Sequence, residues 1–239
     1  MRPIFQIIFL SAAIFFSGCS VKTDVLTKTE AMSFDNKTLV YTQVHELPDF
    51  TAQTAANVQF GLLGIASAVS NGNKMISENH VKDPAIQITK ELTDGLVLNH
   101  HVKVAKSTEA LLASTSVAEL ANQYPEYDYI LDVRTLAWGS LYFPTDWNNY
   151  RVLYNVHARI IDQKKAAVIA EEVCNYDPDV EDTDSAPSYD DLEHTPAIAN
   201  ALKEAVKYCV KHIQDMTHIN TVTSLLTDKL PSQQENSVN

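Results

Sequence analysis

The chain has 239 residues, 45 % of them apolar, and a formal net charge of −12. This length fits one large domain or a domain with tails, and the apolar fraction is sufficient for a hydrophobic core. Phosphate contacts need clustered Lys and Arg, and the densest basic site is the Lys164-Lys165 pair. The charge therefore argues against a nucleic acid partner and against attraction to an anionic membrane surface.

Residues 1–18 have the layout of a secretory signal peptide. Arg2 supplies a positive charge, Ile4 to Phe16 is almost entirely apolar, and the small residues Ser17 and Gly18 follow. The apolar run is shorter than the roughly 20 residues of a membrane-spanning helix, and it lacks the alternating faces of a core helix. We expect residues 1–18 to be removed after export.

The Ser17-Gly18-Cys19 ending resembles the lipobox of bacterial lipoproteins, with Phe16 where the family usually has Leu. This resemblance implies that Cys19 becomes the first residue and carries acyl chains such as palmitate, which together anchor a protein stably. Ser20, rather than Asp, follows the cysteine. By the same resemblance, this implies the bacterial outer membrane, with the domain facing the periplasm.

Polarity divides the exported chain into a lipidated tether (19–37), a globular α/β domain (38–218) and a flexible tail (219–239). Two cysteines remain beside Cys19. In an oxidising compartment, Cys174 and Cys209 are expected to form a disulfide, and two buried free thiols are the alternative. The bond would close a loop of about 35 residues and stabilise the fold by roughly 3 to 4 kcal/mol.

The apolar spacing and the turn residues predict nine elements. They are a strand at 38–45, a helix over 51–77, a helix starting at Asp83-Pro84, a strand at 101–105, a helix at 116–124, strands at 127–138, 150–162 and 166–174, and a helix starting at Thr195-Pro196. Ser116 and Glu119 have capping-box spacing, and the short turn at 163–165 makes its flanking strands an antiparallel hairpin. The predicted class is α+β, a single mixed β-sheet of about five strands flanked by helices, in the order β-α-α-β-α-β-β-β-α.

This order resembles a group of bacterial envelope domains. The helix DPAIQITKELTDGL precedes the strand HVKVA, and YDYILDVRT, the hairpin and a terminal helix follow. The group includes the curli secretion channel lipoprotein, the lipoprotein activators of peptidoglycan synthases and the amino-terminal domain of TolB, and the chain also resembles uncharacterised proteobacterial lipoproteins. The resemblance covers roughly residues 38–217. It implies a sheet flanked by helices that is used for protein contacts rather than chemistry.

Two segments are candidates for such contacts. The link at 139–149 and its flank carry the aromatic residues Trp138, Tyr142, Phe143 and Trp147, which form either a recognition patch or part of the core and loop packing. Val58 to Val69 is the most apolar stretch after the signal peptide. We expect it to be a buried core helix, and an oligomer-forming or membrane-facing segment is the alternative.

The acidic loop at 175–194 contains the best candidates for metal ligands. Its aspartates supply oxygen atoms suited to Ca²⁺, but their spacing is not that of an EF-hand, so a solvated loop is the preferred interpretation; the four are Asp177, Asp179, Asp182 and Asp184. Cys209 and His212 share a helix face, but zinc needs further ligands that the sequence does not place nearby. No metal and no cofactor are therefore expected.

No catalytic arrangement is evident. The sequence lacks G-x-S-x-G, Ser-x-x-Lys and a phosphate-binding glycine loop, and Asp128 and Asp132 are interpreted as polar strand residues rather than a glycosidase pair. The sequence predicts a non-enzymatic lipoprotein that contacts other envelope proteins. A homo-oligomeric, secretion-channel-like lipoprotein and a hydrolase with an unrecognised site are the alternatives. A channel would need a pair of alternating segments of about 10 residues, and none is to spare.

Overall fold

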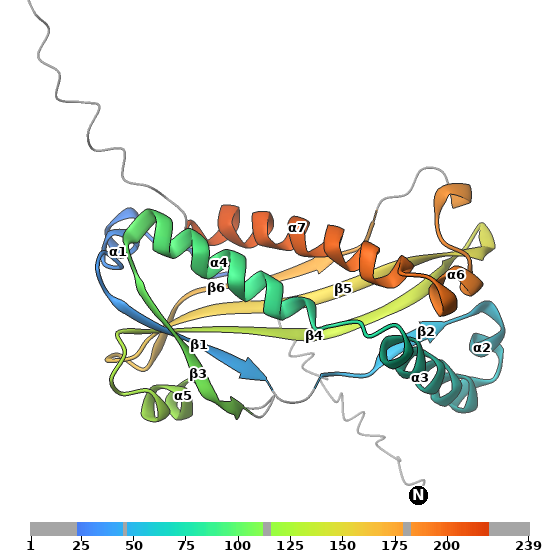
Figure 1. Cartoon of the computed structure of the whole chain (residues 1–239), viewed down its shortest axis with the longest axis horizontal. Helices are drawn as coiled ribbons and strands as arrows, with labels where there is room; N and C mark the ends of the chain where they lie inside the picture. Colours follow the sequence, from blue (N-terminus) through green and yellow to red (C-terminus); the bar gives the residue numbers. More distant parts are fainter. Residues whose placement is uncertain (1–22, 45–46, 112–115, 179–182, 220–239) are drawn as a thin grey trace, which may run out of the picture.

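A single mixed β-sheet of six strands forms the centre of the molecule and does not close into a barrel (Figure 1). The computed structural model describes residues 23–44, 47–111, 116–178 and 183–219. The strands are β1 (Thr38–Val44), β2 (Phe50–Gln53), β3 (Lys103–Leu111), β4 (Tyr129–Phe143), β5 (Asp146–Asp162) and β6 (Ala167–Tyr176). The α+β class is confirmed, with six strands rather than about five.

The strand order is β3-β1-β4-β5-β6, and β2 pairs with the second half of β4. β1 is parallel to β3 and β4, and β2 is parallel to β4. β4, β5 and β6 form an antiparallel meander, so the hairpin expected around residues 163–165 is confirmed. β1 and β2 therefore both lie along the same side of the long strand β4, β1 near its start and β2 near its end.

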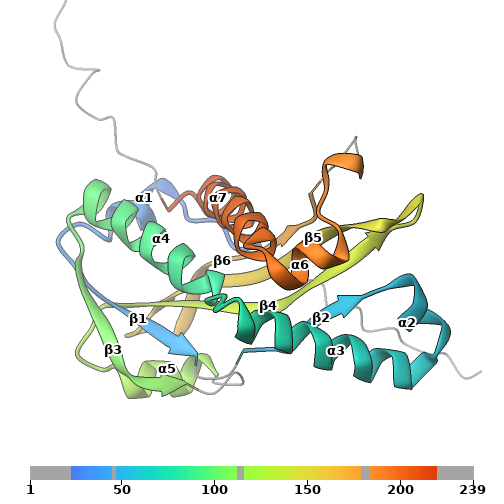
Figure 2. The same ribbon diagram turned by 45° about the vertical axis from the view of Figure 1, so that its right-hand side comes forward.

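Helices flank both faces and one end of this sheet. They are α1 (Lys28–Met32), α2 (Ala55–Gln59), α3 (Gly61–Glu78), α4 (Pro84–His100), α5 (Val117–Gln123), α6 (Tyr189–His194), α7 (Ala197–Thr217) and the 3₁₀ turn η1 (Thr183–Ser185). In Figure 1, α4 and α7 lie side by side over one face, and α5 lies on the other. α3 packs against β2 at the end of the molecule away from α1 (Figure 2).

The main core fills the space between the sheet and the helices α4 and α7. α4 directs Ile88, Leu92 and Leu96 inward, and all three side chains are fully buried. The predicted start of α4 is confirmed, because Asp83 accepts a hydrogen bond from Ala85 N and Pro84 occupies the first turn. The capping box of α5, between Ser116 and Glu119, is also present.

A disulfide joins β6 to α7. Cys174 Sγ and Cys209 Sγ are 2.04 Å apart, which is the pairing that the sequence predicts. Val156 lies opposite Cys174 in the β5–β6 ladder, and all three residues belong to the buried core. The link therefore fixes α7 over the sheet from inside the core.

The segment predicted to be a tether packs on the domain from Asp24 onward. Asp24 forms a backbone bridge with Glu171 of β6, and Leu26 N donates to the carbonyl oxygen of Thr217. Leu26 and Phe34 are buried in the main core, which supplies the apolar contacts that hold the segment in place. The domain thus begins well before residue 38. Cys19 and the predicted signal peptide lie outside the described residues, as does the predicted tail (219–239) except for its first residue, Ile219.

The predicted helix over 51–77 differs at its start. Residues 50–53 form β2 instead, and Thr54 then caps α2 by accepting a hydrogen bond from Asn57 N. A break at Phe60 separates α2 from α3, and Gly61 there has a φ of +53°, which glycine adopts without steric cost. The long helix is therefore a strand followed by two helices.

The expected link at 139–149 is mostly strand. β4 continues to Phe143 and β5 begins at Asp146, so only a tight turn separates strands of 15 and 17 residues. β2 pairs with this extension of β4, and the two backbones approach so closely that a Cβ at Gly139 would lie 2.6 Å from the carbonyl oxygen of Thr51. β4 and β5 are therefore both longer than the strands predicted from the sequence.

Candidate interaction surface

Five exposed apolar residues of the described chain gather on α2, on Phe60 and on the start of α3. We call this set the α2–α3 surface; its members are Val58, Phe60, Leu62, Leu63 and Ile65. Phe60 is 67 % exposed, Leu62 85 % and Leu63 80 %. The prediction that Val58 to Val69 forms a buried core helix is therefore wrong. Exposed apolar patches of this kind commonly mark contact sites.

Close packing on the opposite face of α3 explains why these large residues point outward. The buried positions of α3 are mainly small: Gly64, Ala68 and Gly72, with Met75 after them. A Cβ at Gly64 would overlap the backbone of Asn57, and one at Gly72 would overlap the carbonyl oxygen of Phe50. The helix is thus seated against α2 and β2 by backbone contact, and it cannot turn its leucines inward.

The charge pattern around this surface is also distinctive. No charged residue occurs between Asp49 and Lys74, in a chain whose net charge is −12. Acidic α6 lies beside the second half of α3, where Asn79 Nδ2 donates to the carbonyl oxygen of Glu193 at 3.0 Å. Asp190 and Asp191 lie on the same short helix. The α2–α3 surface is thus an uncharged apolar area, and the contact between α6 and Asn79 lies at the other end of α3.

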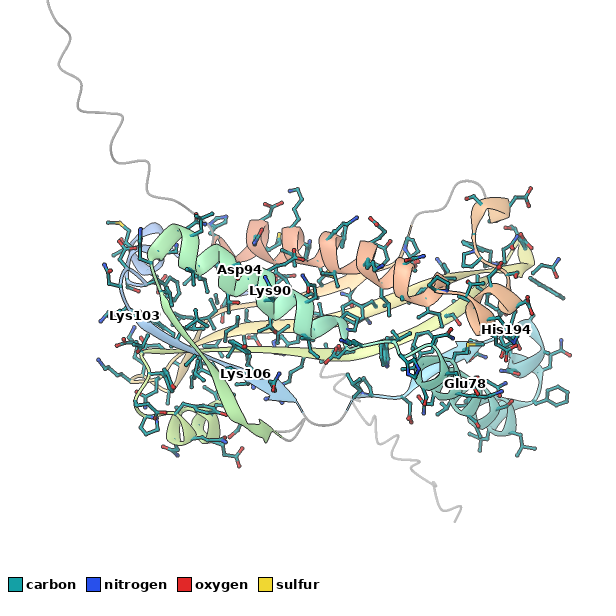
Figure 3. All side chains as sticks on the ribbon, viewed as in Figure 1. Glu78, Lys90, Asp94, Lys103, Lys106 and His194 are labelled. Carbon is teal, nitrogen blue, oxygen red and sulfur yellow. A yellow bond between two sulfur atoms is a disulfide. The ribbon has the colours of Figure 1, made fainter. Side chains whose placement is uncertain are left out.

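An open groove of about 900 Å³ lies between α4 and the strands β1 and β3. We call it the α4 groove. Ile86 and Val97 of α4 contribute exposed apolar side chains to it, at 56 % and 44 % exposure. Its described lining carries three lysines and two acids, namely Lys82, Lys90, Lys106, Asp83 and Asp94. In Figure 3, Lys90 and Asp94 lie on α4 and Lys106 on β3, at some distance from Glu78 and His194 at the end that holds α3 and α6.

The four aromatic residues predicted as a recognition patch differ in exposure and are not presented together at the surface. Trp138 is buried against Phe50 and donates its indole N–H to the carbonyl oxygen of Pro48, and Phe143 is also buried. Tyr142 is partly buried against the core. Trp147 alone is strongly exposed, at 62 %, near the β4–β5 turn. Three of the four are thus packing residues, because the predicted link is a strand with one face on the core.

A buried ionic cluster lies in the sheet on β4. Asp132 accepts hydrogen bonds from Thr42 Oγ1 at 2.7 Å, Arg134 Nε at 2.9 Å and Arg159 Nε at 2.8 Å. Burial alone would raise the pKa of Asp132, but the two arginines and Thr42 outweigh it and hold the pKa below its usual value. All three of these hydrogen bonds come from side chains of the sheet itself. We interpret the cluster as a fold-stabilising ion network.

Asp128 belongs to a separate polar contact at the start of β4. Its carboxylate accepts hydrogen bonds from the backbone N–H and hydroxyl of Thr38 on β1, which lower the pKa of Asp128. Asp128 therefore precedes β4 while Asp132 lies within it, and the two carboxylates have different partners.

The candidate metal ligands have other partners or lie apart. Asp177 accepts two hydrogen bonds from Arg151 Nη1, and Asp184 lies on η1, while Asp179 and Asp182 fall outside the described residues. His212 Nε2 contacts a Glu172 carboxylate oxygen at 3.1 Å. Within the described ranges, no group of three or more His, Cys, Asp or Glu side chains is placed to bind a metal ion. In the same ranges, no helix has the length and apolarity to cross a membrane.

One sequence signal could have identified the orientation of α3. Gly64, Ala68 and Gly72 recur every four residues, which places them on one helix face. A stripe of small residues predicts close backbone packing on that face and leaves the larger Leu62, Leu63 and Ile65 on the other. No comparable sequence pattern predicts the α4 groove.

Comparisons with known proteins give similarities of fold only. No family model and no curated protein matches the chain. Solved structures include a DUF330 protein from Xanthomonas campestris, with 11 % identity over 83 % of this chain and 93 % of that one, at a TM-score of 0.41. A PelC dodecamer from Paraburkholderia phytofirmans has 11 % identity over 83 % and 97 %, at 0.35. A lipoprotein from Neisseria meningitidis has 12 % identity over 75 % and 99 %, at 0.27.

Proposed function

We propose that this protein is a lipoprotein of the bacterial outer membrane, anchored through Cys19, that serves as a non-enzymatic binding or assembly accessory for other envelope proteins. The observation that carries the proposal is the α2–α3 surface, an exposed apolar area held outward by glycine packing on the other side of α3. A soluble domain exposes such a contiguous area at a cost in solubility, so it is expected to be covered by a partner.

The anchor and the domain are closely coupled in this proposal. Five peptide steps separate Cys19 from Asp24, which is paired with β6, and a fully extended chain covers roughly 3.3 to 3.6 Å per residue. The domain is therefore held within about 20 Å of the lipid headgroups. The α2–α3 surface lies at the end of the molecule away from α1 (Figures 1 and 2), so it would be presented at a distance from the point of attachment.

The test is partner capture in intact cells. The full chain is crosslinked in its native envelope, extracted in mild detergent and analysed by mass spectrometry for every protein joined to it. A Leu62→Glu, Leu63→Glu double variant is expected to lose its defined partners. Leu98→Glu is the matched control, because Leu98 is 78 % exposed on α4 and does not line the α4 groove.

Two results would contradict the proposal. Unchanged partner capture by the folded double variant would remove the α2–α3 surface as the contact. Retention of the chain in the soluble periplasmic fraction with Cys19 unmodified would remove the anchor. Trp147→Ala tests the one exposed residue of the predicted aromatic patch in the same assay.

A further inference from the structure

We propose that the partner on the α2–α3 surface is a second copy of this chain, which receives that surface in its α4 groove. This inference rests on the proposed function and names the partner. The two areas lie on different parts of one molecule, so a contact between them joins copies head to tail. Contacts of this kind build rings when the rotation closes and filaments when it does not.

Chemical matching between the two areas is the first argument. The α2–α3 surface presents Phe60, Leu62 and Leu63 as a convex apolar group on α2 and the first turn of α3. The α4 groove is concave, and Ile86 and Val97 provide apolar side chains along its α4 side. Apolar groups that fill a groove and leave water supply the main driving force for such a contact.

Charge is the second argument. Two copies of a chain with a net charge of −12 repel each other, so an area free of charge between Asp49 and Lys74 is the favourable place to meet. The described lining of the α4 groove carries three lysines and two acids, so it does not add to this repulsion.

Geometry is the third argument. The molecule is elongated, with α2 and the start of α3 at one end, and the α4 groove runs along the other half (Figures 1 and 2). A copy docked by its end therefore leaves its own groove open for another copy. The α2–α3 surface is exposed and the α4 groove is open to solvent, so assembly requires no unfolding of the main core.

Association in solution is the direct test. The probe is the full chain carrying Cys19→Ser, which removes the proposed lipid and changes no described residue. Analytical ultracentrifugation is expected to show a concentration-dependent oligomer. The surface variant (Leu62→Glu, Leu63→Glu) and the groove variant (Ile86→Glu, Val97→Glu) should each weaken association at least about tenfold, because each buries unpaired charge in an apolar contact. Leu98→Glu should leave association unchanged.

Mixing the two variants tests the head-to-tail arrangement itself. The surface variant keeps an intact groove, and the groove variant keeps an intact α2–α3 surface. An equimolar mixture should therefore form one-to-one dimers and nothing larger, although each variant alone is monomeric. A contact between two α2–α3 surfaces would instead let the groove variant dimerise on its own, without the surface variant. Circular dichroism and thermal unfolding confirm that both variants are folded.

Other outcomes overturn the inference and separate it from the proposed function. A wild-type chain that stays monomeric at high concentration, or a groove variant that assembles normally, rejects the second copy as the occupant. If the monomeric wild-type chain captures envelope partners and the surface variant does not, the proposed function stands and the partner is a different protein. If it instead floats with neutral phospholipid vesicles in a manner that requires Leu62 and Leu63, the α2–α3 surface meets lipid.

Discussion

The helices α3 and α4 have nearly the same length, 18 and 17 residues, and use opposite kinds of side chain to pack. α4 buries the large residues Ile88, Leu92 and Leu96 and exposes a mixture of polar and apolar residues. α3 buries Gly64, Ala68 and Gly72, and its leucines face away from the domain. The difference shows that apolar content alone does not place a helix in the core. The distance at which a helix packs decides which face it can bury.

The largest expected effect comes from shortening a packing residue of α4. Leu92→Ala should reduce the free energy of unfolding by about 2 to 5 kcal/mol, because it removes a fully buried side chain and leaves a cavity. Urea denaturation of the wild type and the variant measures this loss. A change below about 1 kcal/mol would mean that α4 does not depend on its large residues.

The opposite change should damage α3. Gly72→Ala adds one methyl group where a Cβ would overlap the carbonyl oxygen of Phe50, so α3 must shift away from β2. We expect a loss of about 1 to 3 kcal/mol in urea denaturation, although alanine is the better helix former. Ser70→Ala, at an exposed position of α3, is the control. A Gly72→Ala variant as stable as this control would contradict the tight seating of α3.

A third comparison concerns the caps, since Asp83 caps α4 and no side chain caps α3. Asp83→Ala should cost about 1 kcal/mol of unfolding free energy through loss of the bond to Ala85 N. Burial raises the pKa of Asp83. The pH-dependent stabilisation from this group is therefore fully present below its unfolded pKa and is lost as pH rises through its folded pKa.

The sign of this effect can be read from Asp83→Asn, which does not titrate. Relative to the wild type, the variant should gain stability as the pH rises from about 3 to 7, and thermal unfolding across that range measures the difference. A constant difference would show that burial does not perturb this carboxyl group.

The smallest effect on stability is expected at the outward face of α3. Leu63→Glu should change the free energy of unfolding by less than about 0.5 kcal/mol, because the side chain is 80 % exposed. A loss of several kcal/mol in urea denaturation would instead assign Leu63 to the core.

Local signals in the sequence predicted the elements whose ends have specific chemistry. Asp83-Pro84, the Ser116–Glu119 capping box and the short turn before β6 each fix a boundary through nearby atoms. Contacts between residues far apart in the sequence determine the features that were not predicted. Phe143 is buried because β4 continues past its predicted end, and Leu26 and Phe34 are buried because the main core has room for the segment before β1.

The candidate site could be predicted only in part for the same reason. The apolar run from Val58 to Val69 stands out in the sequence, but its exposure depends on how closely Gly72 approaches β2. The α4 groove depends on the spacing between α4 and two strands that come from either side of it in the chain. Neither distance is encoded in a local pattern of residues.

The pairing of the amino-terminal segment has a consequence for the order in which the protein matures. Leu26 is made early, but its N–H bonds to Thr217, the last residue of α7, and Asp24 pairs with Glu171 on the last strand. The first segment of the domain can therefore form its native contacts only after the last strand and helix have been synthesised. A chain that stops short of α7 would leave its first segment unpaired, so an incomplete molecule would differ from a finished one near the proposed anchor at Cys19.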